Sequence, residues 1–255
     1  MVARLAAILI LLAGLAGTAR AQDGAPLTPR QVQDVQQIIR SYLTAHPEII
    51  ANAMEALREK MQAQAAAATR QAISAHKTEL FDDGNDPIAG NPKGDVTIVE
   101  FFDYNCVYCR ASTKALLDAV KADGDVKVVY KELPILTPSS VVDSRMALAA
   151  MKQGKYEALH RAFMAVRGLL DAKMAYGIAR GTGLDMARLK KDMKSAAVTE
   201  EIRRNKELAS ALGIDGTPTF VIGDMMFAQA LDAAQFTELF HAARADDKVG
   251  SQSKK

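Results

Sequence analysis

Apolar positions recur at helical spacing from residue 28 to residue 80, and the first helix in this region has well-marked ends. Thr28 as N-cap, Pro29 at the first helical position and Gln31 form the pattern of a capping box. A residue before proline is disfavoured in the helical region, so this helix is expected to stop near His46, and Pro47 opens a second helix. The apolar positions of the first helix share one face: Val32, Val35, Ile39, Tyr42 and Leu43.

The second helix carries the spacing of a coiled-coil seam. Ile50, Met54, Leu57 and Met61 follow one another at steps of four, three and four, and Gln64 and Ala68 continue the register with weak core residues. The alanine-rich stretch 62–69 can hold a helix but buries little, which is typical of a stalk or linker. Two helices with one apolar stripe each favour self-association through residues 28–61, as a dimer or a trimer. The alternative is that they pack on the following domain.

The next part of the chain predicts a β-α-β unit. After the turn-rich segment 82–94, residues 96–102 have the β-branched and aromatic content of a buried strand. Residues 110–122 are expected to form a helix, and residues 126–130 a second buried strand. The expected inward-facing residues of the helix are Ala115, Leu116, Ala119 and Val120.

A helical pattern returns from residue 139 to residue 212, broken at glycines 154, 168, 181, 183 and 213. Asp171 and Asp185 are candidate N-caps within it. Residues 220–222 and 226–228 predict a hairpin, and residues 233–243 predict a closing helix. The polar tail 246–255 is expected to be disordered.

The N-terminus has the three-part form of a cleavable signal peptide: a basic start, the apolar run 5–17, and small residues ending at Ala21. The apolar run is shorter than the roughly 20 residues of a membrane-spanning helix, although an uncleaved anchor is the alternative. Removal of residues 1–21 takes away Arg4 and Arg20, so the 32 basic and 30 acidic residues of the chain become balanced. This balance argues against nucleic acid as a partner and, after cleavage, against a membrane surface.

The chain has two cysteines, and they stand in one Cys-x-x-Cys motif, Cys106-Val107-Tyr108-Cys109. A motif that follows a buried strand and opens a helix places the first thiolate beside the free amides of the helix N-terminus, which lowers its pKa. Cys106 is therefore expected to attack, and Cys109 to resolve the mixed disulfide. A zinc site would need about four ligands, and the sequence offers no second cysteine pair, so neither a metal nor another cofactor is expected.

The segment from Phe101 to Cys109, together with Gly216-Thr217-Pro218-Thr219-Phe220, resembles the DsbA-type branch of the thioredoxin superfamily. The resemblance covers residues 80–245 and implies an α/β thioredoxin fold with an all-helical insertion. It also implies a cis peptide between Thr217 and Pro218 beside the reactive cysteines. The alternative for Pro218 is an ordinary proline at the entry to a strand.

Glu100 lies six residues before Cys106 on an otherwise apolar strand. It matches the buried acid that this superfamily uses for proton transfer to and from the resolving cysteine. The alternative is a carboxylate at the edge of the sheet, paired with Lys131.

The motif Tyr42-Leu43-x-x-His46-Pro47-Glu48 is similar to the oligomerisation region of the suppressor-of-copper-sensitivity C proteins, a group that contains trimeric disulfide isomerases. Val107-Tyr108 departs from the Pro-His of strong oxidases, which argues against a powerful oxidant. The sequence thus predicts a periplasmic isomerase that acts on misfolded secreted proteins with a redox partner protein. The alternatives are an oxidase or reductase of the same family, and a holdase or copper-binding protein that uses the same thiols as ligands.

The expected organisation has four parts. They are a signal peptide over residues 1–21, a helical oligomerisation region and linker over 22–75, a DsbA-like thioredoxin domain over 76–245 with its helical insertion at 139–212, and the tail 246–255.

Overall fold

The computed structural model describes residues 26–252, with side chains to residue 245. The expected signal peptide lies outside the described residues. Tertiary contacts divide the chain into two units between Lys60 and Met61. The division falls earlier than the expected boundary at residue 75, because Ile73 is buried in the core of the second unit.

The first unit is helical and confirms the expected helix ends. Helix α1 (Pro29–Ala45) starts with the capping box of Thr28 and Gln31, and His46 is its C-cap. Helix α2 (Glu48–Ala75) starts after Pro47 and continues past the unit boundary. No residue of α1 is buried, and the four seam residues of α2 are also exposed: Ile50, Met54, Leu57 and Met61.

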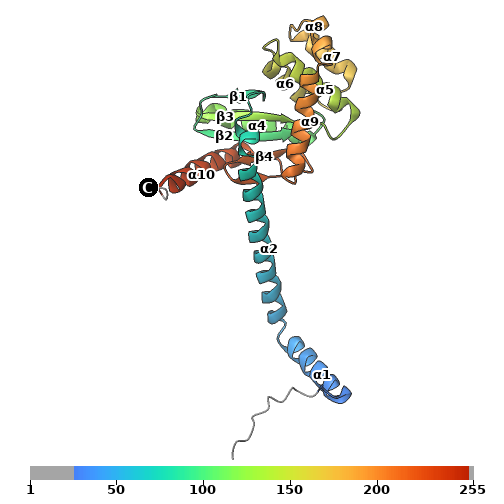
Figure 1. Ribbon diagram of the computed structural model, residues 1–255, viewed down its shortest axis with the longest axis vertical. Coiled ribbons are helices and arrows are strands. Elements are labelled where there is room, and N and C mark those ends of the chain that lie inside the picture. The colour runs from blue at the N-terminus through green and yellow to red at the C-terminus, as the bar shows by residue number, and fades with distance from the viewer. Residues whose placement is uncertain (1–25, 253–255) are drawn as a thin grey trace, which may run out of the picture. The chain divides into compact units, whose positions relative to one another are not determined.

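The second unit contains a five-stranded sheet with strand order β1-β3-β2-β4-β5 (Figure 1). Strand β2 is central; it runs parallel to β3 and antiparallel to β4. The strands are β1 (Ile88–Gly90), β2 (Val96–Phe102), β3 (Val126–Glu132), β4 (Thr219–Ile222) and β5 (Met225–Phe227). The two predicted core strands and the hairpin are therefore confirmed, the hairpin with a shift of about one residue.

Helices cover both faces of this sheet. Ile98 and Phe102 of β2 face a core shared with α4 (Val107–Asp123) and α10 (Ala233–Gln252), while Val99 and Phe101 face a core that includes Leu80 of α3 (Lys77–Phe81). The helical insertion consists of α5 (Pro138–Met151), α6 (Tyr156–Met164), α7 (Ala172–Gly181), α8 (Met186–Asp192) and α9 (Ala196–Ala211), grouped beside the sheet in Figure 1. Asp171 and Asp185 are N-caps, as expected.

Strand β1 was not predicted, because three residues between two prolines are too short to show alternation. It pairs antiparallel with β3, where Ile88 faces Val129. Gly90 ends it with a φ of 72°, and a Cβ there would lie 2.3 Å from the carbonyl oxygen of Val126. Glycine is needed at this position for both reasons.

The ends of two helices differ from the sequence expectations. Helix α4 begins at Val107 instead of Arg110, because Cys106 caps it. Its predicted inward face is correct for Leu116, Ala119 and Val120, whereas Ala115 is half-buried. The expectation of disorder from residue 246 is wrong for the described part of the tail, since α10 continues to Gln252. No proline stands between residue 246 and Gln252 to stop the helix.

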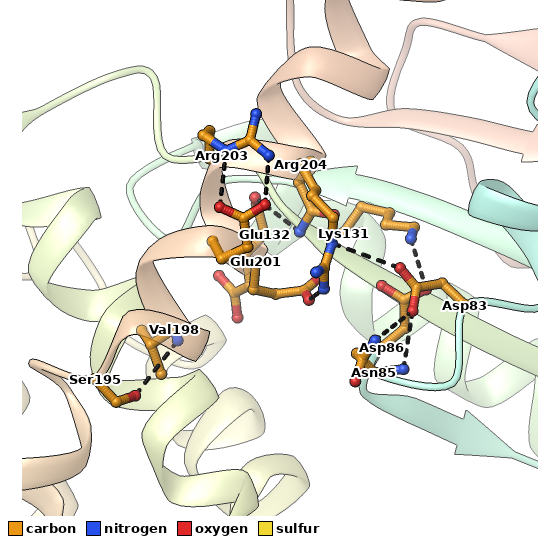
Figure 2. Close-up of polar contacts among 12 residues, drawn as sticks. Asp83, Asn85, Asp86, Lys131, Glu132, Ser195, Val198, Glu201, Arg203 and Arg204 are labelled. Atoms are coloured by element: carbon orange, nitrogen blue, oxygen red, sulfur yellow. Dashed lines mark hydrogen bonds and ion pairs between the residues drawn. The ribbon is translucent and has the colours of Figure 1, made fainter.

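Strand β3 extends two residues beyond the prediction, through Lys131 and Glu132, both fully buried. Lys131 Nζ lies 2.6 Å from Asp86 Oδ2, which comes from the loop between α3 and β1. Figure 2 shows this pair with Asp83 of the same loop and with Arg204 of α9. The ion pair fastens the loop to the sheet at a site closed to water.

We expect Asp86→Asn to destabilise the protein by about 3 kcal/mol or more, because it leaves the buried Lys131 ammonium without a counter-charge. Urea unfolding of the reduced protein measures this loss. The matched control is Asp82→Asn, which removes the longer and more exposed pair of Asp82 with Lys127 at 3.8 Å and should cost below about 0.5 kcal/mol. Equal losses in the two variants would contradict a central role for the buried pair.

Candidate active site

Cys106 occupies the N-cap position of α4. Its backbone is extended (φ −79°, ψ 116°), and its Sγ accepts a hydrogen bond from the backbone N–H of Cys109 at 3.3 Å. Both cysteines carry free thiols, with Cys106 4% exposed and Cys109 fully buried. The sulfur that touches the helix N-terminus is thus also the one nearer to the surface.

A second loop meets the motif from the other half of the chain. The Thr217-Pro218 peptide bond is cis, as the resemblance implied, and it leads into β4. Strand β4 pairs with β2, so Thr219 lies opposite Phe101, a few residues before the motif. As a result the backbone oxygen of Thr217 lies 3.1 Å from Cys106 Sγ. The sheet brings Cys106, Cys109, Thr217 and Pro218 into one site.

The two thiols have opposite acid–base properties. The pKa of Cys106 is lowered to about 6, because the Cys109 thiol and the amides of Tyr108 and Cys109 donate hydrogen bonds to its sulfur, which outweighs the effect of burial. Burial raises the pKa of Cys109 above its ordinary value, and the neighbouring Cys106 and Glu100 act in the same direction. At neutral pH the pair is therefore a thiolate at Cys106 and a thiol at Cys109.

Glu100 lies on the central strand and is fully buried. Within the described residues, neither of its carboxyl oxygens has a hydrogen-bond partner. Burial raises the pKa of Glu100 to about 8, with further contributions from the negative charges of Cys106 and Glu132. The alternative of an edge carboxylate paired with Lys131 is wrong, because β2 is not an edge strand and Lys131 pairs with Asp86.

The residues just before Cys106 were not singled out by the sequence, yet they fasten the motif to the helical insertion. Asp103 Oδ2 accepts hydrogen bonds from the N–H groups of Ile135 (2.9 Å) and Leu136 (3.0 Å), and its Oδ1 accepts from Ser140 Oγ at 2.7 Å. Asn105 Oδ1 accepts from the N–H of Leu170 at 2.8 Å. The sequence signal that could have indicated this role is the presence of polar residues between a buried strand and the reactive cysteine.

Arg110 follows the motif and adds a positive charge near it. Its guanidinium donates to the backbone oxygen of Gly168 and, at 3.3 Å, to Asn105 Oδ1. Gly168 and Leu170, in one loop of the insertion, therefore bind Arg110 after the two cysteines and Asn105 before them. Val107 and Tyr108, between the cysteines, are 66% and 64% exposed and present apolar surface to an incoming chain.

This arrangement can carry out thiol–disulfide exchange. A lowered thiolate pKa at a helix N-terminus, a buried second thiol one turn further on, and a backbone oxygen beside the first sulfur are the parts that this chemistry needs. Residues 97–241 match the family described as DSBA-like thioredoxin domain.

The chain belongs to the DSBA-like thioredoxin domain family. Residues 31–64 also match the family described as copper resistance protein ScsC N-terminal domain. Together the two matches confirm the thioredoxin fold and the resemblance to the ScsC group.

Solved structures agree with this membership. A thioredoxin-like oxidoreductase from Silicibacter pomeroyi is 44% identical with a TM-score of 0.64, and the match covers 66% of this chain and 97% of that one. ScsC of Proteus mirabilis, in a transitional conformation, is 29% identical with a TM-score of 0.65, over 86% of this chain and 100% of the other.

Curated relatives include the thiol:disulfide interchange protein DsbA of Bordetella parapertussis, 27% identical over 60% of this chain and 75% of the relative. The chain also matches Na(+)/H(+) antiporters, among them NhaA of Herminiimonas arsenicoxydans at 30% identity over 62% of this chain, but it spans about a quarter of their length. Among the described residues of this DSBA-like chain, no helix has the length and apolar character to cross a membrane.

We expect the Cys106 thiol of this DSBA-like site to react with iodoacetamide with a half-maximal rate at a pH of about 6, because only the thiolate is the nucleophile. The rate should therefore rise as the pH increases through this value and then level off. Thiolate absorbance against pH gives an independent reading. In the Cys106→Ser control, Cys109 should react slowly with iodoacetamide near neutral pH. Rapid alkylation of that variant would refute the assignment of Cys106 as the thiolate and Cys109 as the thiol.

Proposed function

We propose that this chain is a periplasmic disulfide isomerase, which rearranges wrong disulfides in misfolded secreted proteins. The observation that carries this proposal is the exposed apolar seam of α2, joined in one chain to a DSBA-like redox domain. Oxidase and reductase activities use the same thiols, so the chemistry of the site alone does not distinguish them. The seam is what favours an isomerase.

The seam residues are 48–61% exposed in the described chain: Ile50, Met54, Leu57 and Met61. Apolar residues at coiled-coil spacing are stable in water only when another helix covers them. The match of residues 31–64 to the ScsC N-terminal domain family supports a second copy of this chain as the cover. A dimer or trimer would bring several Cys106 sites to one client and raise the effective concentration for a second exchange.

The reaction begins when the Cys106 thiolate attacks one sulfur of a client disulfide. A Cys106–client disulfide forms, the client bond breaks, and its electron pair leaves on the other client sulfur as a thiolate. A client thiolate can then attack the mixed disulfide, which releases Cys106 and leaves the client with a new disulfide but no net change of oxidation state. This sequence isomerises the client.

The competing path leads to reduction of the client. Cys109 attacks Cys106 Sγ, a Cys106–Cys109 disulfide forms, and the client leaves with two more electrons. A redox partner protein must then return the site to the dithiol. In this scheme Glu100 accepts the proton of Cys109, while the backbone beside cis-Pro218, at Thr217, pairs with the extended client segment. The signal-peptide pattern of residues 1–21 supports the periplasm as the compartment.

Cys106→Ser should abolish both reduction of insulin disulfides and reactivation of scrambled ribonuclease, because it removes the attacking sulfur. Cys109→Ser should abolish insulin reduction by the dithiol and keep measurable isomerisation, since the mixed disulfide can still be released by a client thiol. If Cys106→Ser reduces insulin and reactivates scrambled ribonuclease as well as the unaltered chain does, the enzyme proposal fails and a holdase is favoured.

The paired substitution Met54→Lys and Leu57→Lys should convert the full chain to a monomer, because two like charges face each other at the centre of the seam. Insulin reduction should stay within about twofold, whereas reactivation of scrambled ribonuclease should fall roughly tenfold through the lost avidity. Light scattering gives the mass. The control is Glu55→Lys with Arg58→Glu, which reverses an exposed pair on the same helix. A monomer that isomerises normally would refute the role of the seam.

A further inference from the structure

A second carboxyl, Glu132, is buried at the end of β3, near the redox site but outside the cysteine motif. Its Oε1 accepts hydrogen bonds from the hydroxyls of Tyr104 (2.9 Å) and Tyr156 (2.8 Å), and its Oε2 accepts from Ser144 Oγ at 2.7 Å. Three donors on one side chain are what stabilises a buried carboxylate.

The donors come from separate elements that meet at this point. Tyr104 lies two residues before Cys106, Ser144 lies on α5 and Tyr156 lies on α6. His160 of α6 completes the cluster, with Nδ1 3.2 Å from the Tyr104 hydroxyl. Burial lowers the pKa of His160 to about 3, so this imidazole is neutral and supplies no positive charge.

Glu132 and Glu100 lie on neighbouring strands and on the same face of the sheet. Glu132 is paired in register with Phe102, and Glu100 with Tyr130, and steps of two residues keep a strand's side chains on one face. The Tyr130 ring also packs against His160, with 4.4 Å between centroids. The two carboxyls are therefore buried on one face of the sheet, where the charge of Glu132 acts on Glu100.

The titratable and charged groups that face this pair offer no compensating cation. Around Glu132 they are Tyr104 and Asp103 from the motif loop, and Tyr156 and His160 from α6. The neutral Asn205 side chain of α9 donates a hydrogen bond to the backbone oxygen of Glu132. Around Glu100 they are Tyr130 from β3, Cys106 and Cys109 at the start of α4, and Glu132 itself. Within the described residues neither carboxylate has an ion-pair partner.

Two buried carboxyls with no cation between them resist being ionised together. Burial raises the pKa of each to about 8, so their surroundings decide which one gives up its proton first. Glu132 has three donors, whereas both oxygens of Glu100 lack a partner among the described residues. Glu132 is therefore the first of the two to lose its proton, and its charge then opposes the ionisation of Glu100.

We propose that Glu132 is a positioning residue for the exchange reaction, whose negative charge keeps Glu100 protonated and so favours isomerisation over reduction. The inference rests on the proposed role of Glu100 as the acceptor of the Cys109 proton. When Cys109 attacks Cys106 Sγ, a sulfur–sulfur bond forms between them, the Cys106–client bond breaks with its electrons on the client sulfur, and the Cys109 proton passes to the Glu100 carboxylate. A protonated Glu100 cannot accept it, so the mixed disulfide lives longer and a client thiol has time to attack.

The test measures the rate at which Cys109 releases a peptide from a preformed mixed disulfide with Cys106, as a function of pH, in the full chain. For the unaltered protein this rate should rise with pH as the buried Glu100 carboxyl loses its proton. Glu132→Gln keeps the size and one acceptor oxygen but removes the charge. It should displace the profile by roughly one unit to lower pH, which is about a tenfold faster release at neutral pH, and scrambled ribonuclease should be reactivated less well.

The double variant with Glu100→Gln separates the two claims. Glu132→Gln should have no effect on the profile in that background, because the group through which it acts is gone. If Glu100→Gln flattens the profile and Glu132→Gln leaves it unmoved, the inference about Glu132 is overturned while the role of Glu100 stands. If Glu100→Gln itself changes nothing, both are overturned.

The matched control is Glu200→Gln, which removes an exposed carboxylate that pairs with Arg203 on α9 and should leave the profile in place. If Glu132→Gln does not fold, Tyr156→Phe takes its place. Loss of one donor makes Glu132 a weaker acid, so the profile should move in the same direction by a smaller amount. A shift to higher pH, or none, in a folded Tyr156→Phe protein would overturn the inference.

Discussion

The site depends on one contact, the approach of Cys106 Sγ to the free amides at the start of α4. A helix N-terminus stabilises a negative charge only within its first turn, so the sulfur must be held there by the chain on either side of it. Asp103 and Asn105 fasten the incoming segment to the helical insertion, and the Thr217-Pro218 loop closes the site from β4. The insertion is therefore part of the redox centre, since without it the segment before Cys106 would have few partners.

The burial of ionisable side chains is the main unfavourable contribution to the stability of this arrangement. Glu100, Glu132 and Lys131 are all fully buried, and only Lys131 has an ionic partner. Burial of an unpaired carboxyl is unfavourable unless hydrogen bonds or a proton compensate for it. Hydrogen bonds compensate for the burial of Glu132, and a bound proton compensates for the burial of Glu100. A protein that needed only a stable core would have an apolar residue at each position.

Much of this structure could be predicted from the sequence because its signals are local. The capping box at Thr28, the strand 96–102 and the cysteine motif each depend on residues within a few positions of one another, and all three lie where they were expected. The cis-Pro218 loop came from a family resemblance and not from periodicity. Glu132 was missed because its partners Tyr104, Ser144 and Tyr156 come from three other parts of the chain, 12 to 28 residues away. A hydrophobic pattern records which residues are buried, but not which polar groups meet inside.

The last two residues of β3 have a consequence for how the chain selects its strand pairing. Lys131 and Glu132 are neighbours in sequence and so face opposite sides of the sheet, Lys131 toward Asp86 and Glu132 toward three hydroxyl donors. A slip of β3 by one residue would exchange the two faces. Glu132 would then meet the Asp86 carboxylate, and the Lys131 ammonium would enter a cluster built to donate hydrogen bonds. These two adjacent side chains, both labelled in Figure 2, therefore disfavour the nearest wrong register on both faces of the sheet at once.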